Sequence, residues 1–227
     1  SKALESFKVV REKAPDSLII ANIGIAQLIS RGVDAAKECI EMIRADGLSI
    51  HLNPLQELLQ AEGDRDFKGG LEVIRDVVKE VDVPVLVKET GAGISPQVAK
   101  RLEEVGVAAV NVSGVGGTSW AAVEHYRNLR RGEKLLASVA ETFWDWGLPT
   151  AFLVKTVSEV VKIPVVASGG VRTGVDVAKA ITIGAALAAM ARPLLAPALE
   201  GRRQLELYVR KIIIEPVSYT HLRAHET

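Results

Sequence analysis

Residues 48–57, Leu48-Ser-Ile-His-Leu-Asn-Pro-Leu-Gln-Glu57, set the pattern on which this chain is built. Successive side chains of a strand point to opposite faces, so Leu48, Ile50 and Leu52 share one face. Ser49, His51 and Asn53 share the other face. The segment therefore predicts a strand with one apolar and one polar face, followed by a loop that carries Gln56 and Glu57.

Similar runs recur along the chain. They are short and rich in β-branched residues, each ends in polar or glycine residues, and helical periodicity follows them. The runs span residues 17–24, 48–53, 83–89, 108–113, 163–168 and 185–191. Ser95-Pro96 is typical of a helix start and Gly106 of a helix end. Strands that alternate with helices predict a parallel sheet covered by helices.

Composition narrows the class of protein. The chain has 227 residues, 28 Lys and Arg against 28 Asp and Glu, and 48% apolar residues, which suit one globular domain and exclude a disordered class. With no net charge, no overall field attracts nucleic acid or an acidic membrane. The single cysteine, Cys39, cannot form an internal disulfide, which favours a reducing compartment. We therefore expect a cytoplasmic protein.

Membrane insertion and export are not predicted. The most apolar stretch, residues 185–199, contains an arginine and two prolines, and it is shorter than the roughly 20 residues of a membrane span. No charged and then apolar leader opens the chain. The length also lies slightly below the roughly 250 residues of an ordinary eight-stranded α/β barrel.

The polar strand faces point to a common site. In such barrels the functional groups lie at the carboxyl ends of the strands. By strand parity, the groups that face the barrel mouth are Asn22, Ser49, His51, Asn53, Lys88, Asn111, Ser113 and Ser168. Buried polar groups at this density need a ligand, or else one another, as hydrogen-bond partners. Lys88 suits a Schiff base or a permanent cation beside an electron-rich ring or a phosphate.

Glycine-rich turns add a phosphate site. Ser168-Gly-Gly-Val-Arg172 follows one strand and precedes a helix, so that backbone N–H groups can hold a phosphate. Met190-Ala-Arg-Pro193 closes the next strand and can reach the same phosphate. A third turn, Ser113-Gly-Val-Gly-Gly-Thr-Ser-Trp120, brings Thr118 toward a ligand.

Two further segments have two interpretations each. Glu57 is either a Mg²⁺ ligand, which would share the ion with substrate phosphates, or a solvated loop carboxylate. About 50 residues separate Ser113 from Ile163, and a connection of this length indicates a functional segment or extra helices. Within it, residues 143–149 favour a hydrophobic contact at a helix start over substrate contact.

The last residues differ from the rest. Residues 217–227, Val-Ser-Tyr-Thr-His-Leu-Arg-Ala-His-Glu-Thr, continue no strand or helix period. They resemble translated vector or adapter sequence. We therefore expect one domain over residues 1–216 and a disordered tail of foreign origin over 217–227.

Together these motifs resemble one family. They are Ala21-Asn-Ile-Gly24, Ile50-His-Leu-Asn-Pro-Leu-Gln-Glu57, Val87-Lys-Glu89, Val112-Ser-Gly-Val-Gly-Gly-Thr-Ser-Trp120, Asp145-Trp-Gly-Leu-Pro-Thr150 and Ala167-Ser-Gly-Gly-Val-Arg172. The chain resembles type 2 isopentenyl diphosphate isomerase of the archaeal sort over roughly residues 4 to 200. The resemblance implies a (β/α)8 TIM barrel that lacks about its first two strands, with six βα units present.

The resemblance also implies a function. The family interconverts isopentenyl and dimethylallyl diphosphate, with reduced FMN as acid–base catalyst, NADPH or another reductant to prime the flavin, and Mg²⁺ for the diphosphate. By motif, His51 and Gln56 would be catalytic, Gln56 and Asn53 would contact substrate, and Glu57 would bind Mg²⁺. The residues that would contact the flavin are Asn22, Lys88, Ser113 and Thr118. Those that would hold its phosphate are Gly170, Val171, Arg172, Ala191 and Arg192.

Part of that family's site has no counterpart here. The basic residues that grip the substrate diphosphate belong to the two strands that are lacking. We therefore expect this chain alone to bind FMN weakly and to be inactive, whereas the parent enzyme would be a homo-oligomer, a tetramer or octamer. One alternative is an FMN-dependent oxidoreductase of the 2-hydroxy-acid oxidase or IMP dehydrogenase type, although no His-x-x-Arg pair precedes Ser168 and no cysteine follows Ser113. Another is a phosphate-binding barrel piece without turnover.

Overall fold

Six parallel strands form one sheet in a computed structural model that describes residues 2–224, with side chains over residues 7–217. The strands are β1 (Ile20–Gly24), β2 (Gly47–Leu52), β3 (Val85–Glu89), β4 (Ala109–Asn111), β5 (Val165–Ala167) and β6 (Leu187–Ala188). Their order in the sheet is their order in the chain, and each neighbouring pair is parallel. The predicted strands are confirmed in number and order; five have shorter bounds, and β2 is shifted by one residue.

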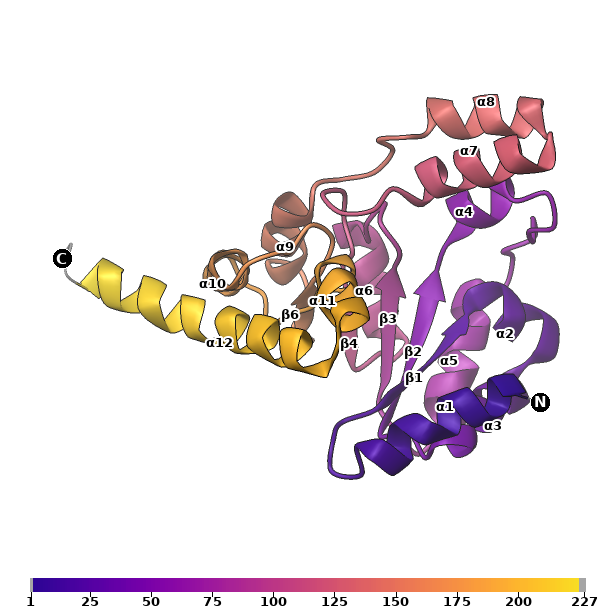
Figure 1. The fold of residues 1–227 in the computed structure, drawn as a ribbon. Coiled ribbons are helices and arrows are strands. Elements are labelled where there is room, and N and C mark those ends of the chain that lie inside the picture. The colour runs from indigo at the N-terminus through magenta and orange to yellow at the C-terminus, as the bar shows by residue number, and fades with distance from the viewer. Residues whose placement is uncertain (1, 225–227) are drawn as a thin grey trace.

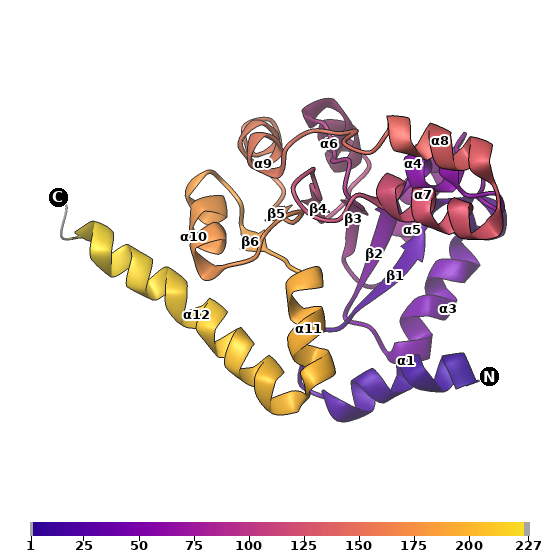
Figure 2. The same cartoon turned by 45° about the horizontal axis from the view of Figure 1, so that its top comes forward.

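Helices follow each strand and cover one face of the curved sheet (Figures 1 and 2). The helices are α1 (Lys2–Lys13), α2 (Ile25–Arg31), α3 (Val33–Ile43), α4 (Pro54–Leu59), α5 (Gly70–Glu80), α6 (Pro96–Glu104), α7 (Trp120–Arg131), α8 (Lys134–Thr142), α9 (Thr150–Ser158), α10 (Gly174–Thr182), α11 (Arg192–Glu200) and α12 (Arg202–Ala224). Among the described residues, no helix is both long enough and apolar enough to cross a membrane. The α/β architecture agrees with a barrel of which six βα units are present.

Local signals explain the helix boundaries. The Ser95 hydroxyl accepts the Val98 N–H at 3.3 Å, and Pro96 opens α6 as the sequence predicts. Gly106 and Gly184 end their helices with positive φ angles of 91° and 117°, a region that glycine enters without strain. Residues 53–57 were expected as a loop, but Pro54–Leu59 form the short helix α4, with Pro54 in its first turn.

The main core lies between the sheet and its helices. Leu48, Ile50 and Val87 are fully buried there and face outward from the barrel. The opposite, inward face carries the polar residues, since the register pairs Ser49 with Leu86, His51 with Lys88, and Lys88 with Asn111. The predicted alternation of an apolar outer face and a polar inner face is therefore confirmed.

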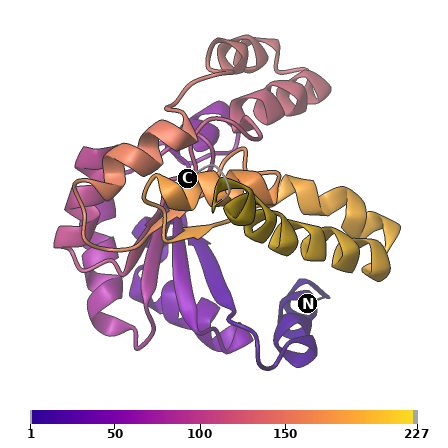
Figure 3. The same ribbon diagram turned by 90° about the vertical axis from the view of Figure 1, so that its left-hand side faces the viewer.

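The long connection and the last helix complete the fold. α7, α8 and α9 occupy the segment between β4 and β5, so the prediction of extra helices there is confirmed, and α7 and α8 lie together with α4 beyond the strand ends (Figures 1 and 3). α12 packs against α10 and α11. It runs to Ala224, so the helix includes residues 217–224, and the domain boundary at residue 216 with a disordered tail of foreign origin stays a prediction. Residues 225–227 lie outside the described residues.

Candidate functional site

The polar side chains of the inner face meet at the carboxyl ends of β1, β2 and β3. Asn22 Nδ2 lies 3.0 Å from His51 Nδ1, and the register places His51 beside Lys88. Burial lowers the pKa of His51, and the neighbouring Lys88 ammonium lowers it further, while the Glu57 carboxylate acts in the opposite direction. His51 is therefore neutral near pH 7 and can accept or donate a proton through its ring nitrogens.

Lys88 is a half-buried cation that has no partner among the described residues. No hydrogen bond or ion pair of its Nζ is found among the side chains that the structure describes. Burial lowers the pKa of Lys88, against a smaller opposing effect of the adjacent Glu89 carboxylate. An ammonium that is partly desolvated and unpaired is unfavourable unless an anion or an electron-rich group fills the space before it. The state of Lys88 therefore indicates that the centre of the mouth holds a ligand.

Asn53 and Glu57 form a second pair above β2. Asn53 Nδ2 donates to Glu57 Oε1 at 2.8 Å, and the Asp64 N–H donates to Glu57 Oε2 at 3.2 Å. Asn53 is 5% exposed, yet its buried Oδ1 accepts no hydrogen bond from the described residues, and the Ser49 hydroxyl likewise has no partner. A self-satisfied network exists only in part, as where Ser168 Oγ donates to Asn111 Oδ1 at 2.6 Å. Asn53 Oδ1 is thus a buried acceptor without a donor among the described residues.

Glycine turns build the opposite side of the mouth. Gly169 and Gly170 have φ angles of 94° and 84°, and a Cβ on either would collide with the backbone of the turn after β4. No acceptor in the described structure takes the N–H of Gly169, Gly170 or Val171. Consecutive free N–H groups in a left-handed turn form an anion-binding concavity, as the sequence predicts for this turn.

Arg172 supports this turn. Its guanidinium donates to Gly170 O at 3.1 Å and to Gly116 O at 2.8 Å, so it ties the two glycine turns together. Ser113, the first residue of the turn after β4, has a φ angle of 40°, which is uncommon outside glycine. Ala191 and Arg192 form the exposed start of α11, and no hydrogen bond links the Arg192 side chain to the described part of the turn after β5.

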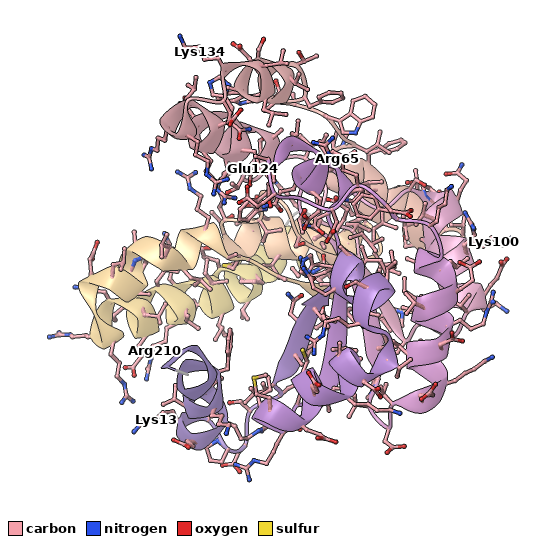
Figure 4. The ribbon with its side chains drawn as sticks, turned by 90° about the vertical axis from the view of Figure 1, so that its right-hand side faces the viewer. Lys13, Arg65, Lys100, Glu124, Lys134 and Arg210 are labelled. Carbon is pink, nitrogen blue, oxygen red and sulfur yellow. The ribbon has the colours of Figure 1, made fainter. Side chains whose placement is uncertain are left out.

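Gln56 contacts Glu124, whereas His51 contacts Asn22. Its Nε2 donates to Glu124 Oε1 at 3.2 Å, and the same oxygen accepts Gln60 Nε2 at 3.0 Å and Arg127 Nη1 at 2.8 Å. Glu124 is 1% exposed on α7, where Figure 4 shows it beneath the α7–α8 pair. Sequence reasoning missed Glu124. The sequence pattern that could have indicated its burial is the helical spacing of Ala121, Glu124 and Asn128, which form the buried face of α7.

An aromatic segment completes the rim. Phe143, Trp144 and Trp146 line a pocket with Gln56 and Thr118. Ser119 Oγ donates to Trp144 O at 2.6 Å, and the Leu148 N–H donates to Ala92 O at 3.0 Å. These bonds hold residues 143–149 over the turns that follow β3 and β4. Both interpretations of the segment, hydrophobic contact and substrate contact, therefore stay predictions.

Glu57 is the candidate metal ligand that the sequence predicts. No group of three or more His, Cys, Asp or Glu side chains suited to a metal occurs among the described residues. Mg²⁺ often takes only one or two protein carboxylates and completes its shell with substrate phosphates and water. Glu57 fits that mode of binding and no other metal mode.

Comparison with known proteins shows what the chain is similar to. The model of the family described as FMN-dependent dehydrogenase matches residues 51–215. A protein of Methanosarcina barkeri named isopentenyl-diphosphate delta-isomerase is 46% identical over 211 residues, which cover 93% of this chain and 57% of that protein. Proteins of the same name from Archaeoglobus fulgidus and Methanothermobacter thermautotrophicus are 49% and 50% identical over 91% and 88% of this chain, and 59% and 54% of their own lengths.

The chain thus spans little more than half the length of these relatives. Among solved structures, FabK from Thermotoga maritima matches 84% of this chain and 46% of its own chain, with a TM-score of 0.55 and 21% identity. At that identity the match supports the α/β fold alone.

Proposed function

This chain belongs to the family of FMN-dependent dehydrogenases, and from that premise we propose that its barrel mouth binds FMN. The observation that carries the proposal is that two features occur in one mouth. One is the half-buried cation Lys88, which has no partner among the described residues, and the other is the set of free N–H groups in the turn after β5. A flavin mononucleotide has an electron-rich ring for the first and a phosphate for the second. Asn22, Ser113 and Thr118 would contact the ring and its ribityl chain.

We further propose that the full-length protein interconverts isopentenyl and dimethylallyl diphosphate. The names of the relatives support this reaction, which requires a proton to be added to one carbon and removed from another. Reduced FMN, when bound, would supply the acid–base group, and NADPH would supply its reducing equivalents. Mg²⁺ on Glu57 would neutralise diphosphate charge. We expect the full-length protein to act in the cytoplasm as a homo-oligomer.

The chain's own residues would position the substrate. Gln56, held by Glu124, and Asn53, which donates to Glu57, would orient it over the mouth. Neutral His51 can relay a proton because burial and Lys88 keep its pKa low. The aromatic residues of 143–149 would exclude water from the alkene, and fixed positioning can supply several kcal/mol of the barrier reduction.

A flavin titration tests the first proposal. The chain is joined to the part of the Archaeoglobus fulgidus relative that it does not match, and FMN binding is followed by flavin fluorescence. Lys88→Gln is expected to raise the Kd about tenfold, which is 1.4 kcal/mol. Lys100→Gln, on the exposed face of α6, is the matched control. Equal affinity of the two variants would refute the role of Lys88.

An isomerase assay tests the reaction. The hybrid protein is supplied with reduced FMN, Mg²⁺ and isopentenyl diphosphate, and dimethylallyl diphosphate is measured. Glu57→Gln is expected to weaken the dependence on Mg²⁺, whereas an unchanged dependence would exclude Glu57 as its ligand. A hybrid that binds FMN but forms no product, even though its fold is intact, would contradict the proposed reaction.

A further inference from the structure

Glu89, the last residue of β3, holds the turn that follows it, residues 90–93, which we call the Glu89 turn. Glu89 is 7% exposed, and a single oxygen of its carboxylate, Oε2, accepts four consecutive backbone N–H groups. The donors are Thr90 at 2.6 Å, Gly91 at 2.5 Å, Ala92 at 2.5 Å and Gly93 at 3.1 Å. Hydrogen bonds to an ionised acceptor are roughly twice as strong as those between neutral groups, so one negative charge fixes the whole turn.

Lys88 does not compete for this carboxylate. The two residues are neighbours in β3, so their side chains point to opposite faces of the sheet. No ion pair of either residue is found among the side chains that the structure describes. The charge of Glu89 therefore acts on the turn, and the Lys88 ammonium stays available to the mouth.

The Glu89 turn lies directly against two other loops. The Leu148 N–H donates to Ala92 O at 3.0 Å. A Cβ on Gly147 would lie 2.5 Å from that oxygen, and a Cβ on Gly91 would lie 3.1 Å from Thr118 O, so the backbones are in direct contact. The turn therefore supports the aromatic segment on one side and the loop after β4 on the other.

These three loops surround the pocket into which Gln56 also extends. The Glu89 turn and the aromatic segment contribute to its walls, and all three tryptophans of the chain, Trp120, Trp144 and Trp146, line it. Gln56 is a residue that we propose to contact substrate. The shape of the pocket beside Gln56 therefore depends on where the Glu89 turn lies.

We propose that Glu89 is a positioning residue, whose carboxylate determines where the aromatic segment, residues 143–149, lies beside Gln56. The proposal rests on the proposed function, because the substrate contact of Gln56 belongs to that function. Glu89 acts through the Ala92 carbonyl, to which the segment is hydrogen-bonded. An uncharged acceptor of the same size binds four N–H groups less strongly, so Glu89→Gln should loosen the turn and, through it, the segment.

Hydrogen exchange of the chain alone, without flavin or substrate, tests this transmission. Glu89→Gln should speed exchange about tenfold at residues 90–93, which lose the charged acceptor, and also at Leu148, which is bonded to Ala92 and not to Glu89. Exchange at residues 48–52 of β2 should stay unchanged. Faster exchange at residues 90–93 with none at Leu148 would overturn the proposal, as would equal acceleration throughout the sheet.

Two further variants control the exchange experiment. Glu104→Gln, at the exposed end of α6, is the matched control and should leave exchange at Leu148 unchanged. Gly147→Ala keeps the carboxylate but forces the segment away from Ala92 O, so it should speed exchange at Leu148 and leave the turn protected. It tests the same contact if the first variant does not fold, and a Leu148 that stays protected would then contradict the proposal.

Kinetics of the hybrid protein separate positioning from general support of the mouth. Glu89→Gln should lower kcat for isopentenyl diphosphate about tenfold and change the Kd for FMN less than about twofold, because displaced pocket walls misplace the substrate. A parallel loss of FMN affinity would refute the positioning role. A hybrid that is inactive with Glu89 in place would count against the proposed function, whereas unchanged exchange at Leu148 counts against the role of Glu89, so the two failures are distinguishable.

Discussion

The centre and the ends of the sheet face the same barrel interior but differ in burial. Ser49 of β2 is 4% exposed, whereas Leu187 of β6 is 62% exposed, although both are inward-facing. The more apolar residue is the more exposed one. Burial at these positions therefore depends on whether a strand lies on each side, not on the hydrophobicity of the residue.

The largest effect is expected where the sheet is covered. Leu48→Ala removes a fully buried side chain from the core between β2 and its helices and should lower the free energy of unfolding by about 2–5 kcal/mol. Leu187→Ala, at the open end, should change it by less than about 0.5 kcal/mol. Urea denaturation of both variants measures the difference. Equal losses would mean that the end of the sheet is as well packed as its centre.

Glu124 extends the comparison to the helices beyond the strand ends. Glu124→Ala leaves Gln56, Gln60 and Arg127 without their shared acceptor and should cost about 1–3 kcal/mol of unfolding free energy. Thermal unfolding measures it. Glu104→Ala, at the exposed end of α6, is the control and should have little effect. A small effect of Glu124→Ala would show that α4 and α7 are held by apolar packing alone.

Polar contacts hold the open end at β1. The Ile19 N–H and the Arg11 guanidinium both donate to Asp46 and lower the pKa of its carboxyl group. A lowered pKa stabilises the fold above the ordinary value near 3.9, and this contribution is lost as the pH falls through the folded-state pKa. Asp46→Asn should therefore flatten the acid side of the stability profile, measured by urea denaturation at several pH values. An unchanged profile would assign the acid response to other carboxylates.

The smallest expected effect is a change in the pKa of His51, on the inner face of the sheet. Lys88→Gln should raise the pKa of His51, because the Lys88 ammonium is one of the two causes that lower it. Burial, the larger cause, remains, so the pKa should stay below the ordinary value near 6.5. NMR titration of the imidazole measures this shift, with Lys100→Gln as control. No change would place the Lys88 ammonium too far from His51 to act on it.

Part of the site was predictable because its signal is local. Strand parity brought Asn22, His51 and Lys88 to one face, and the structure places them there. The contact of Gln56 with Glu124 joins residues 68 positions apart, and that of Arg11 with Asp46 joins residues 35 apart. The residue spacing within a single helix or strand cannot predict a contact between such distant residues. Residues 53–57 were expected as a loop, because one turn of helix has too short a period to recognise.

The sequence by itself determined the six strands, their parallel order and the division of each into an outer apolar and an inner polar face. These follow from the two-residue period of a strand and the connections between strands. Only the tertiary structure decided that Lys88 lacks a partner among the described side chains, that Glu124 is buried and that Leu187 is exposed. Desolvation and pairing depend on which distant segments surround a side chain, and that information is absent from any local pattern.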